Sequence, residues 1–277
     1  MATNALTAIQ RPGRPARYTL RLVALAYLFF LLILPVGIVF KRTFENGLAP
    51  VWDALTTSSA LHAIQITLEV SVIATLLNTI FGVGAAILIT RHNFPGKRVL
   101  NAFIDLPLAV SPVVVGLALI LIYGRFEPVG KWFEARGFQI IFSLPGMVMA
   151  TVFVSLPLVV RAVAPVLEEI GVEQEQAAWT LGAGPIRTFW RVTLPAIRWA
   201  LAYGVVLALA RCLGEFGAIA VVSGNIEGKT QTLTLFVQDH YQNFDQPAAY
   251  AAAFLLMAIA IAALFVIKLL RPKEGSS

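Results

Sequence analysis

Long apolar segments alternate with short polar segments along almost the whole chain. A helix needs about 20 mostly apolar residues to cross the hydrocarbon core of a bilayer, and six segments meet this requirement. They lie near residues 20–40, 64–89, 104–123, 143–163, 200–222 and 248–270. The pattern therefore predicts an all-α membrane protein with six transmembrane helices.

The first apolar segment follows a cluster of arginines, as in a secretory signal peptide. The apolar run continues directly into Lys41 and Arg42 without a small-residue cleavage site, so we expect a retained helix. The predicted segments are a cytoplasmic tail (1–19), the first transmembrane helix with its outer loop (20–63), the main transmembrane domain (64–270) with a long polar loop (164–199), and a second cytoplasmic tail (271–277).

Basic residues predict the orientation of these spans. Cytoplasmic loops of membrane proteins are enriched in Lys and Arg, and six spans place both termini on one side. With that side cytoplasmic, fourteen of the 21 Lys and Arg residues lie inside, six lie outside, and Arg211 lies within a span. We therefore expect an inner-membrane protein whose two termini and 164–199 loop are cytoplasmic.

The composition agrees with a lipid environment. The chain is 58% hydrophobic and only 13% charged, whereas soluble domains have about 25% charged residues. The net charge of +6 follows from the basic inner loops. The sequence shows no basic face with interleaved aromatic residues, so we do not expect nucleic-acid binding. Residues 223–230 nearly form a phosphate-binding loop, but they follow a membrane segment instead of a strand, so we expect no ATPase activity.

The 164–199 loop has a helix–glycine–helix pattern. Residues 168–181 predict one helix, because acidic residues precede strong helix formers. The glycines and proline of 182–185 would end that helix, and residues 186–195 predict a second, amphipathic helix that closes before the next span. Such a segment could present a short helix either to a soluble protein or to lipid headgroups. The spacing alone is compatible with both.

This loop resembles the EAA loop of ABC-importer permeases. The matching positions are Gln176, Ala177, Ala178, Gly182, Ala183, Leu194 and Pro195. The resemblance implies a type I ABC-importer permease fold, in which this loop forms the coupling helix that docks into a cytoplasmic ATPase. Gln176 stands where the family usually has Glu, so we expect no carboxylate contact with the ATPase from that position.

Two further segments, residues 91–117 and 210–233, resemble sulfate and molybdate permeases. Residues 111–114 with 191–201 are most similar to the CysW-type subunits of sulfate/thiosulfate importers. This resemblance implies a subunit with no cofactor and no ATPase of its own. The implied partners are ABC ATPase subunits, a second homologous permease subunit and a periplasmic sulfate-binding protein, with the lipid bilayer around them.

The alternatives concern the cargo and the class of transporter. The same architecture could import molybdate or tungstate instead of sulfate or thiosulfate. A solitary secondary anion transporter is an alternative of another class, and it would not need the patterned inner loop.

Charged residues and helix breakers inside the predicted spans mark a candidate translocation pathway. Arg211 and Glu215 are four residues apart in the fifth span, so they are expected on one helix face. A charge at the bilayer centre costs about 2.5–3.5 kcal/mol, but a cation in a low-dielectric site favours anions. Ser111, Pro112 and Gly116 are assigned to the same pathway, because carbonyls freed by proline cannot face lipid. The alternatives are a structural ion pair and simple kinked packing.

Overall fold

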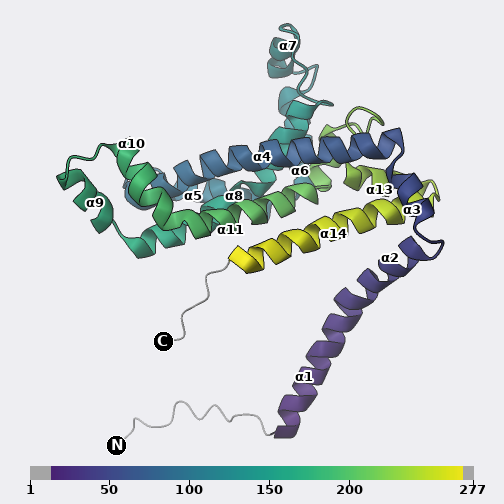
Figure 1. The fold of residues 1–277 in the computed structure, drawn as a ribbon. Helices are drawn as coiled ribbons and strands as arrows, with labels where there is room; N and C mark the ends of the chain where they lie inside the picture. The colour runs from purple at the N-terminus through teal and green to yellow at the C-terminus, as the bar shows by residue number, and fades with distance from the viewer. Residues whose placement is uncertain (1–13, 271–277) are drawn as a thin grey trace, which may run out of the picture.

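The computed structural model describes residues 14–270, and every regular element in this range is helical (Figure 1). In chain order the α-helices are α1 (Arg14–Leu28), α2 (Leu34–Phe44), α3 (Ala49–Leu55), α4 (Ser58–Arg91), α5 (Lys97–Ala109), α6 (Pro112–Tyr123), α7 (Pro128–Glu134), α8 (Leu144–Ile170), α9 (Glu173–Thr180), α10 (Pro185–Thr188), α11 (Leu194–Leu213), α12 (Gly217–Val222), α13 (Leu233–Gln242) and α14 (Gln246–Leu270). Two π-helical turns, η1 (Phe29–Ile33) and η2 (Phe189–Thr193), join α1 to α2 and α10 to α11. The all-α prediction is confirmed. Of the two predicted tails, residues 1–13 and 271–277 lie outside the described residues.

Five helices of the described chain are long and apolar enough to cross a membrane. They are Tyr18–Phe44, Ser58–Arg91, Leu144–Ile170, Pro185–Leu213 and Gln246–Ala263. A sixth crossing is available if α5 and α6 together count as one span. These segments correspond to the six predicted apolar segments, although several boundaries differ.

The third predicted span is broken, not merely kinked. The chain turns by 113° between α5 and α6. Pro112 disfavours a helical conformation in the residue before it, and Ser111 is accordingly extended, with φ −60° and ψ 134°. Pro107 lies inside α5 without ending it. The expected single helix over 104–123 is therefore wrong, because Pro112 separates two helices.

The core lies where α4, α8 and α11 pack together (Figure 1). Small residues let these helices approach closely, as is common in membranes. A Cβ atom added to Gly82 would lie 2.9 Å from Val159, and one added to Gly204 would meet the same helix. The Asn78 amide donates a hydrogen bond of 2.7 Å to the Ser155 hydroxyl, which ties α4 to α8.

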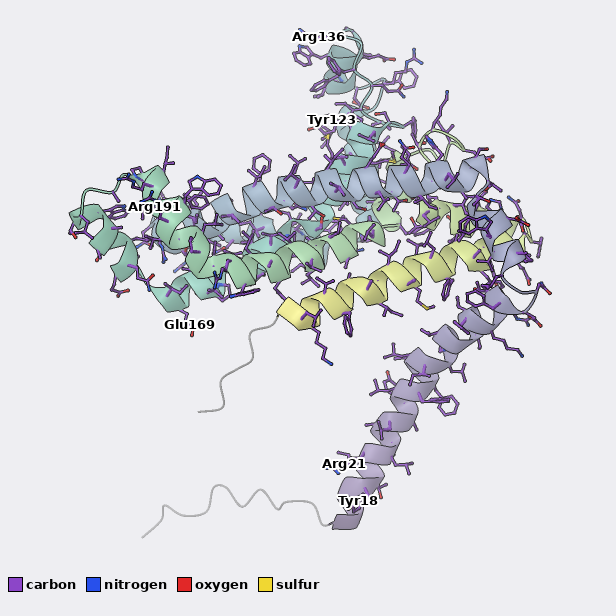
Figure 2. The ribbon with its side chains drawn as sticks, in the orientation of Figure 1. Tyr18, Arg21, Tyr123, Arg136, Glu169 and Arg191 are labelled. Carbon is purple, nitrogen blue, oxygen red and sulfur yellow. The ribbon has the colours of Figure 1, made fainter. Side chains whose placement is uncertain are left out.

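The first span leaves the body of the molecule (Figure 1). None of the most apolar part of Tyr18–Phe44 is buried in the chain, and Figure 2 shows Tyr18 and Arg21 far from the other helices. Its C-terminal end is anchored to α14, where Thr43 donates a hydrogen bond of 3.1 Å to the carbonyl of Tyr250 and Phe40 and Phe44 contact the ring of Phe254. This apolar helix therefore needs lipid or another protein around it.

Both π-helical turns directly precede a Leu-Pro pair, Leu34-Pro35 and Leu194-Pro195. A proline ring clashes with the carbonyl four residues earlier in an α-helix, and a π turn widens the backbone at that point. The helix therefore continues through the proline. The amphipathic stretch 186–195 was expected to close before the fifth span, but Pro185–Leu213 forms one span of 29 residues.

Candidate functional site

The polar loop between α8 and α11 begins with a break that the sequence analysis did not predict. Gly171 has φ +73°, in the left-handed region that favours glycine. It separates the end of α8 from α9, which begins at Glu173. The prediction of one helix over 168–181 is therefore wrong, since its first residues belong to the end of α8.

The predicted turn after α9 is present and has a defined hydrogen-bond pattern. The Gly182 amide donates to the Trp179 carbonyl at 2.9 Å, and the Ala183 amide donates to the Ala178 carbonyl at 3.0 Å. These two bonds form a Schellman motif, which requires a left-handed residue at the glycine position. Gly182 has φ +82°, and no atom lies within 4 Å of a Cβ built there. The glycine is needed by the backbone, and the space beside it is open.

An open groove of about 680 Å³ lies between α9 and the start of α11. Its lining includes Gln174, Ala177, Ala178, Leu181, Arg191 and Pro195. Three residues predicted from the EAA pattern therefore meet at one surface. We call residues 174–195 the coupling segment. Figure 2 shows Arg191 of this segment and Glu169 of α8 at the same end of the molecule.

The other four predicted docking residues are placed differently. Gln176 and Gly182 are exposed, and Ala183 is half-buried beside them. Leu194 packs against the buried cluster that includes Val163 of α8. The Leu194 side chain therefore contributes to the core.

Sequence reasoning missed two apolar residues that flank the turn. Leu181 is 88% exposed and Ile186 is 76% exposed. Trp179 and Trp190 are also more than half exposed on the same segment. Their position beside the predicted Gly182–Pro185 turn was the available signal, because apolar side chains at an exposed turn often mark an interaction surface.

The sequence analysis also missed the inward face of α9. Glu175 is buried, and its carboxylate lies 2.9 Å from Nε of Arg91 at the end of α4. The Thr193 hydroxyl of η2 donates a hydrogen bond of 2.8 Å to the same carboxylate. Arg91 is 84 residues from Glu175, so no local pattern could connect them.

Arg211 and Glu215 form an ion pair, but not on one helix. α11 ends at Leu213, before the expected end of the fifth span, and Glu215 lies in the break before α12. The Arg211 guanidinium lies 2.9 Å from Oε2 of Glu215. Oε1 of Glu215 accepts a hydrogen bond of 3.0 Å from the Ala218 amide, at the start of α12. The expectation of a shared helix face is therefore wrong, and Gly214 is where α11 ends.

Pro112 and Gly116 lie against α12, next to this break. A Cβ atom added to Gly217 would lie 3.1 Å from Cβ of Pro112. One added to Gly116 would lie 2.9 Å from the Ala218 carbonyl. Ser111 is exposed at the start of α6. The structure thus brings α6 to the Glu215 break, with close packing at Gly116.

A single helix connects the coupling segment to the ion pair. Pro195 lines the groove at one end of α11, and Arg211 lies near the other end. Sixteen residues at 1.5 Å per residue separate them by about 24 Å along the axis. A displacement at the groove can therefore be transmitted along one rigid element.

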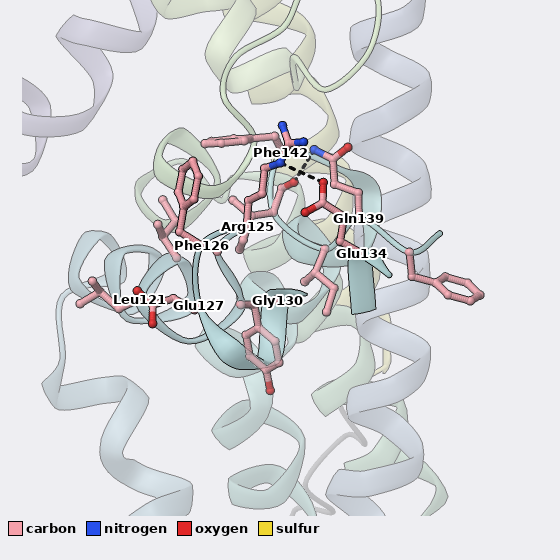
Figure 3. Close-up of a pocket in the computed structure, with 14 residues that line it drawn as sticks. Leu121, Arg125, Phe126, Glu127, Gly130, Glu134, Gln139 and Phe142 are labelled. Carbon is pink, nitrogen blue, oxygen red and sulfur yellow. Dashed lines mark hydrogen bonds and ion pairs between the residues drawn. The ribbon is translucent and has the colours of Figure 1, made fainter. Parts of the chain in front are cut away.

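A separate cavity of about 500 Å³ lies away from the coupling segment (Figure 3). It lies beneath α7, which projects from the helix bundle (Figure 1). Arg125 and Glu134 form an ion pair of 3.0 Å in its wall. None of the residues predicted from the sequence lines this cavity. Within residues 14–270 no group of three or more side chains is arranged to hold a metal ion.

Comparison with known proteins agrees with this geometry. Residues 78–275 match the family model of the binding-protein-dependent transport system inner membrane component. The chain is 48% identical to the sulfate transport system permease protein CysW of Synechocystis, over 94% of each chain. It is 46% identical to CysW of Escherichia coli K12, over 87% of this chain and 83% of that protein.

Solved structures share the fold at low sequence identity. A bacterial ABC transporter that imports alginate superposes with a TM-score of 0.76 at 17% identity, over 94% of this chain and 96% of that one. The methionine transporter MetNI gives a TM-score of 0.53 at 16% identity, over 76% and 96%. The predicted type I importer fold is thereby confirmed.

The family match also shows that transport and ATP hydrolysis belong to different subunits. A membrane component of this kind is a transport subunit, and the ATPase is a separate subunit. Such a component works with a binding protein. The chain belongs to the family of inner-membrane components of binding-protein-dependent ABC transporters, in the branch that contains the CysW permeases.

Proposed function

We propose that this chain is a permease subunit of an ABC importer that carries sulfate or thiosulfate across the inner membrane. The CysW sulfate transport permeases of Synechocystis and Escherichia coli K12 are 48% and 46% identical to it over most of the chain. The observation that carries the mechanism is the coupling segment, whose groove and exposed apolar turn adjoin the helix that reaches Arg211.

The coupling segment is the proposed ATPase-docking surface. Gln176, Ala177 and Gly182 offer small or uncharged exposed positions, and Leu181 offers an apolar one. The groove favours a protein over lipid headgroups as its occupant. A side chain or helix of another protein can insert into the groove and fill it, whereas lipid headgroups would only lie across it. ATP-driven closure of the ATPase subunits would then move the start of α11.

A second homologous permease is proposed to complete the pathway. Arg211 is 41% exposed in its side chain, and a charge at membrane depth must face protein or water instead of lipid. Pro112 and Gly116 of α6 pack against α12 next to the same break, and Ser111 directly precedes this helix. The uncovered first span offers a further contact surface for that partner.

The periplasmic partner is proposed to be a sulfate-binding protein. The helix α7 and its cavity project from the side of the bundle, away from the coupling segment at one end (Figure 1). With the coupling segment in the cytoplasm, as the basic residues indicate, α7 faces the periplasm, and both termini are cytoplasmic.

Two bulky substitutions at neighbouring glycines test the docking surface, and Gly182→Ala reports the backbone strain alone, because Gly182 has φ +82°. Gly182→Trp places an indole at the turn after α9, where no atom lies within 4 Å of a Cβ, and Gly184→Trp adds the same bulk at a neighbouring glycine with φ −75° and equally open space. We expect the ATPase to co-purify with the wild type and Gly184→Trp, and to be lost from Gly182→Trp. Equal retention in the wild type and both tryptophan variants would contradict docking at this turn.

Labelled uptake tests the cargo. In a deletion strain, the wild-type chain should restore sulfate uptake, and excess thiosulfate should compete more strongly than molybdate or tungstate. Stronger competition by molybdate would assign the chain to molybdate import. Uptake by the purified chain alone, without an ATPase, would identify a solitary carrier and overturn the importer.

A further inference from the structure

One buried carboxylate joins α9 to η2 and to the end of α4, and through Arg91 it is linked to α8. Oε2 of Glu175 lies 2.9 Å from Nε of Arg91, and Oε1 lies 3.4 Å from the second guanidinium nitrogen, Nη2. The Thr193 hydroxyl donates to Oε1 at 2.8 Å. The third nitrogen, Nη1, donates at 2.8 Å to the carbonyl of Leu167 in the last turn of α8.

The contact with Leu167 satisfies a carbonyl that would otherwise be left unpaired. Leu167 is one of the last four residues of α8, whose carbonyls have no partner within the helix. The two charged side chains are only 10% and 12% exposed. Charges at this depth are tolerated when they are paired and hydrogen-bonded. Arg91 thus contacts α8 and α9 together, from the end of α4.

The attachment of α9 to the body depends on this polar contact. Of the eight residues of α9, only Glu175 is buried. α9 carries no buried apolar side chain that would fix it against the body. Without the carboxylate, the helix would be held mainly by its connections at Gly171 and at the Gly182 turn, and both glycines have positive φ.

The neighbouring residue has the opposite orientation. Gln176, at the position where the family usually has Glu, is exposed. Successive residues of a helix are rotated by about 100°, so an acid at 175 points inward while the side chain at 176 points outward. The acid of this chain is therefore directed at its own membrane helices.

We infer that Arg91 and Glu175 are positioning residues that lock the coupling helix to the ends of α4 and α8, so that motion imposed on α9 moves the membrane helices with it. This inference rests on the proposed docking function. In the intact complex, ATP hydrolysis then drives transport only while the latch (Arg91, Glu175, Thr193 and the Leu167 carbonyl) is closed. With the latch open, α9 follows the ATPase and the spans do not.

The test measures transport per ATP hydrolysed in the complete complex reconstituted into vesicles with the sulfate-binding protein. Glu175→Gln keeps the size and one acceptor oxygen but removes the charge, and Glu173→Gln is the matched control, since Glu173 is exposed in the same turn. We expect Glu175→Gln to retain the ATPase and its hydrolysis while sulfate transported per ATP falls at least about tenfold. Glu173→Gln should keep the wild-type ratio.

Two further variants separate positioning from a general loss of fold. Thr193→Val replaces the hydroxyl by a methyl group and should lower the ratio less than Glu175→Gln does. The exchange Arg91→Glu with Glu175→Arg should recover part of the ratio that either single substitution loses. A spin label on Thr180→Cys should become more mobile in Glu175→Gln than in the wild type.

The outcomes distinguish this inference from the docking proposal. An unchanged ratio and an unchanged spin-label mobility in Glu175→Gln would overturn the latch, whatever Gly182→Trp does. A lowered ratio in Glu175→Gln together with full ATPase retention in Gly182→Trp would support the latch and overturn docking at the turn. A lower yield of the complex in Glu175→Gln, with an unchanged amount of sulfate transported per ATP in the complex that remains, would make Arg91 and Glu175 a structural ion pair and overturn their positioning role.

Discussion

The Arg211 guanidinium lies 2.9 Å from the Glu215 carboxylate, although the helix that carries Arg211 ends between them. Glu215 is 2% exposed, whereas the Arg211 side chain is 41% exposed. The acid also accepts from the Ala218 amide, which fixes it at the start of α12. The buried acid therefore holds the arginine at the edge of the helix break, where one side of the guanidinium remains open.

Replacement of Arg211 should abolish sulfate uptake. Arg211→Ala removes the cation that faces the proposed pathway and leaves a buried carboxylate unpaired, which is destabilising. Arg211→Ala with Glu215→Gln removes both charges and should assemble at the wild-type level but still fail to transport. Uptake is measured with labelled sulfate, and assembly by co-purification of the complex. Normal uptake by the double variant would exclude Arg211 from the mechanism.

Gly116→Val should destabilise the packing of α6 against α12. The added side chain would meet Cβ of Val221 at 2.8 Å and the Ala218 carbonyl at 2.9 Å, and overpacking of this kind costs about 1–3 kcal/mol. Gly84→Val is the control, because no atom lies within 4 Å of a Cβ at Gly84. The Tm of the purified complex should fall for Gly116→Val only; a comparable fall for both would contradict the close packing.

Loss of the hydrogen bond between α4 and α8 should have a modest effect. Asn78→Ala removes the donor to Ser155, and interhelical hydrogen bonds in membranes contribute about 0.6 kcal/mol on average, with a maximum of about 1.7. Thr90→Ala removes a hydroxyl that bonds only within its own helix and should change stability less. The free energy of unfolding in detergent measures both, and a larger loss for Thr90→Ala would contradict this assignment.

Reporter fusions should place the coupling segment and the loop after α7 on opposite sides of the membrane. A reporter active only in the periplasm is expected to be inactive when fused at Gly184 and active when fused at Gly137. Both glycines are exposed, with open space around them. The reverse pattern would invert the predicted topology and move the coupling segment away from the cytoplasm.

Hydropathy predicted the membrane helices well because their apolar length depends only on local sequence. It did not predict where they break. Pro107 and Pro112 looked alike in the sequence, yet only Pro112 follows an extended residue and separates two helices. Similarly, Leu194-Pro195 looked like a helix end, but a π-helical turn absorbs the proline.

The candidate site was predictable only on its outer face. The glycine turn and the small residues of α9 follow one another in the sequence, so their spacing identified them. The partner of Glu175 comes from the end of another helix, 84 residues earlier. Leu181 is exposed, although its hydropathy would predict a buried side chain. Both features are set by tertiary packing, which a single sequence does not record.

The continuity of α11 has a thermodynamic consequence. If binding of the ATPase at Pro195 alters the affinity for anion near Arg211 by some factor, then the anion must alter the affinity for the ATPase by the same factor. An anion bound in the pathway would thus raise or lower the affinity for the ATPase about 24 Å away. The helix α11 therefore couples the two sites in both directions: ATPase binding affects the anion site, and anion binding affects the ATPase site.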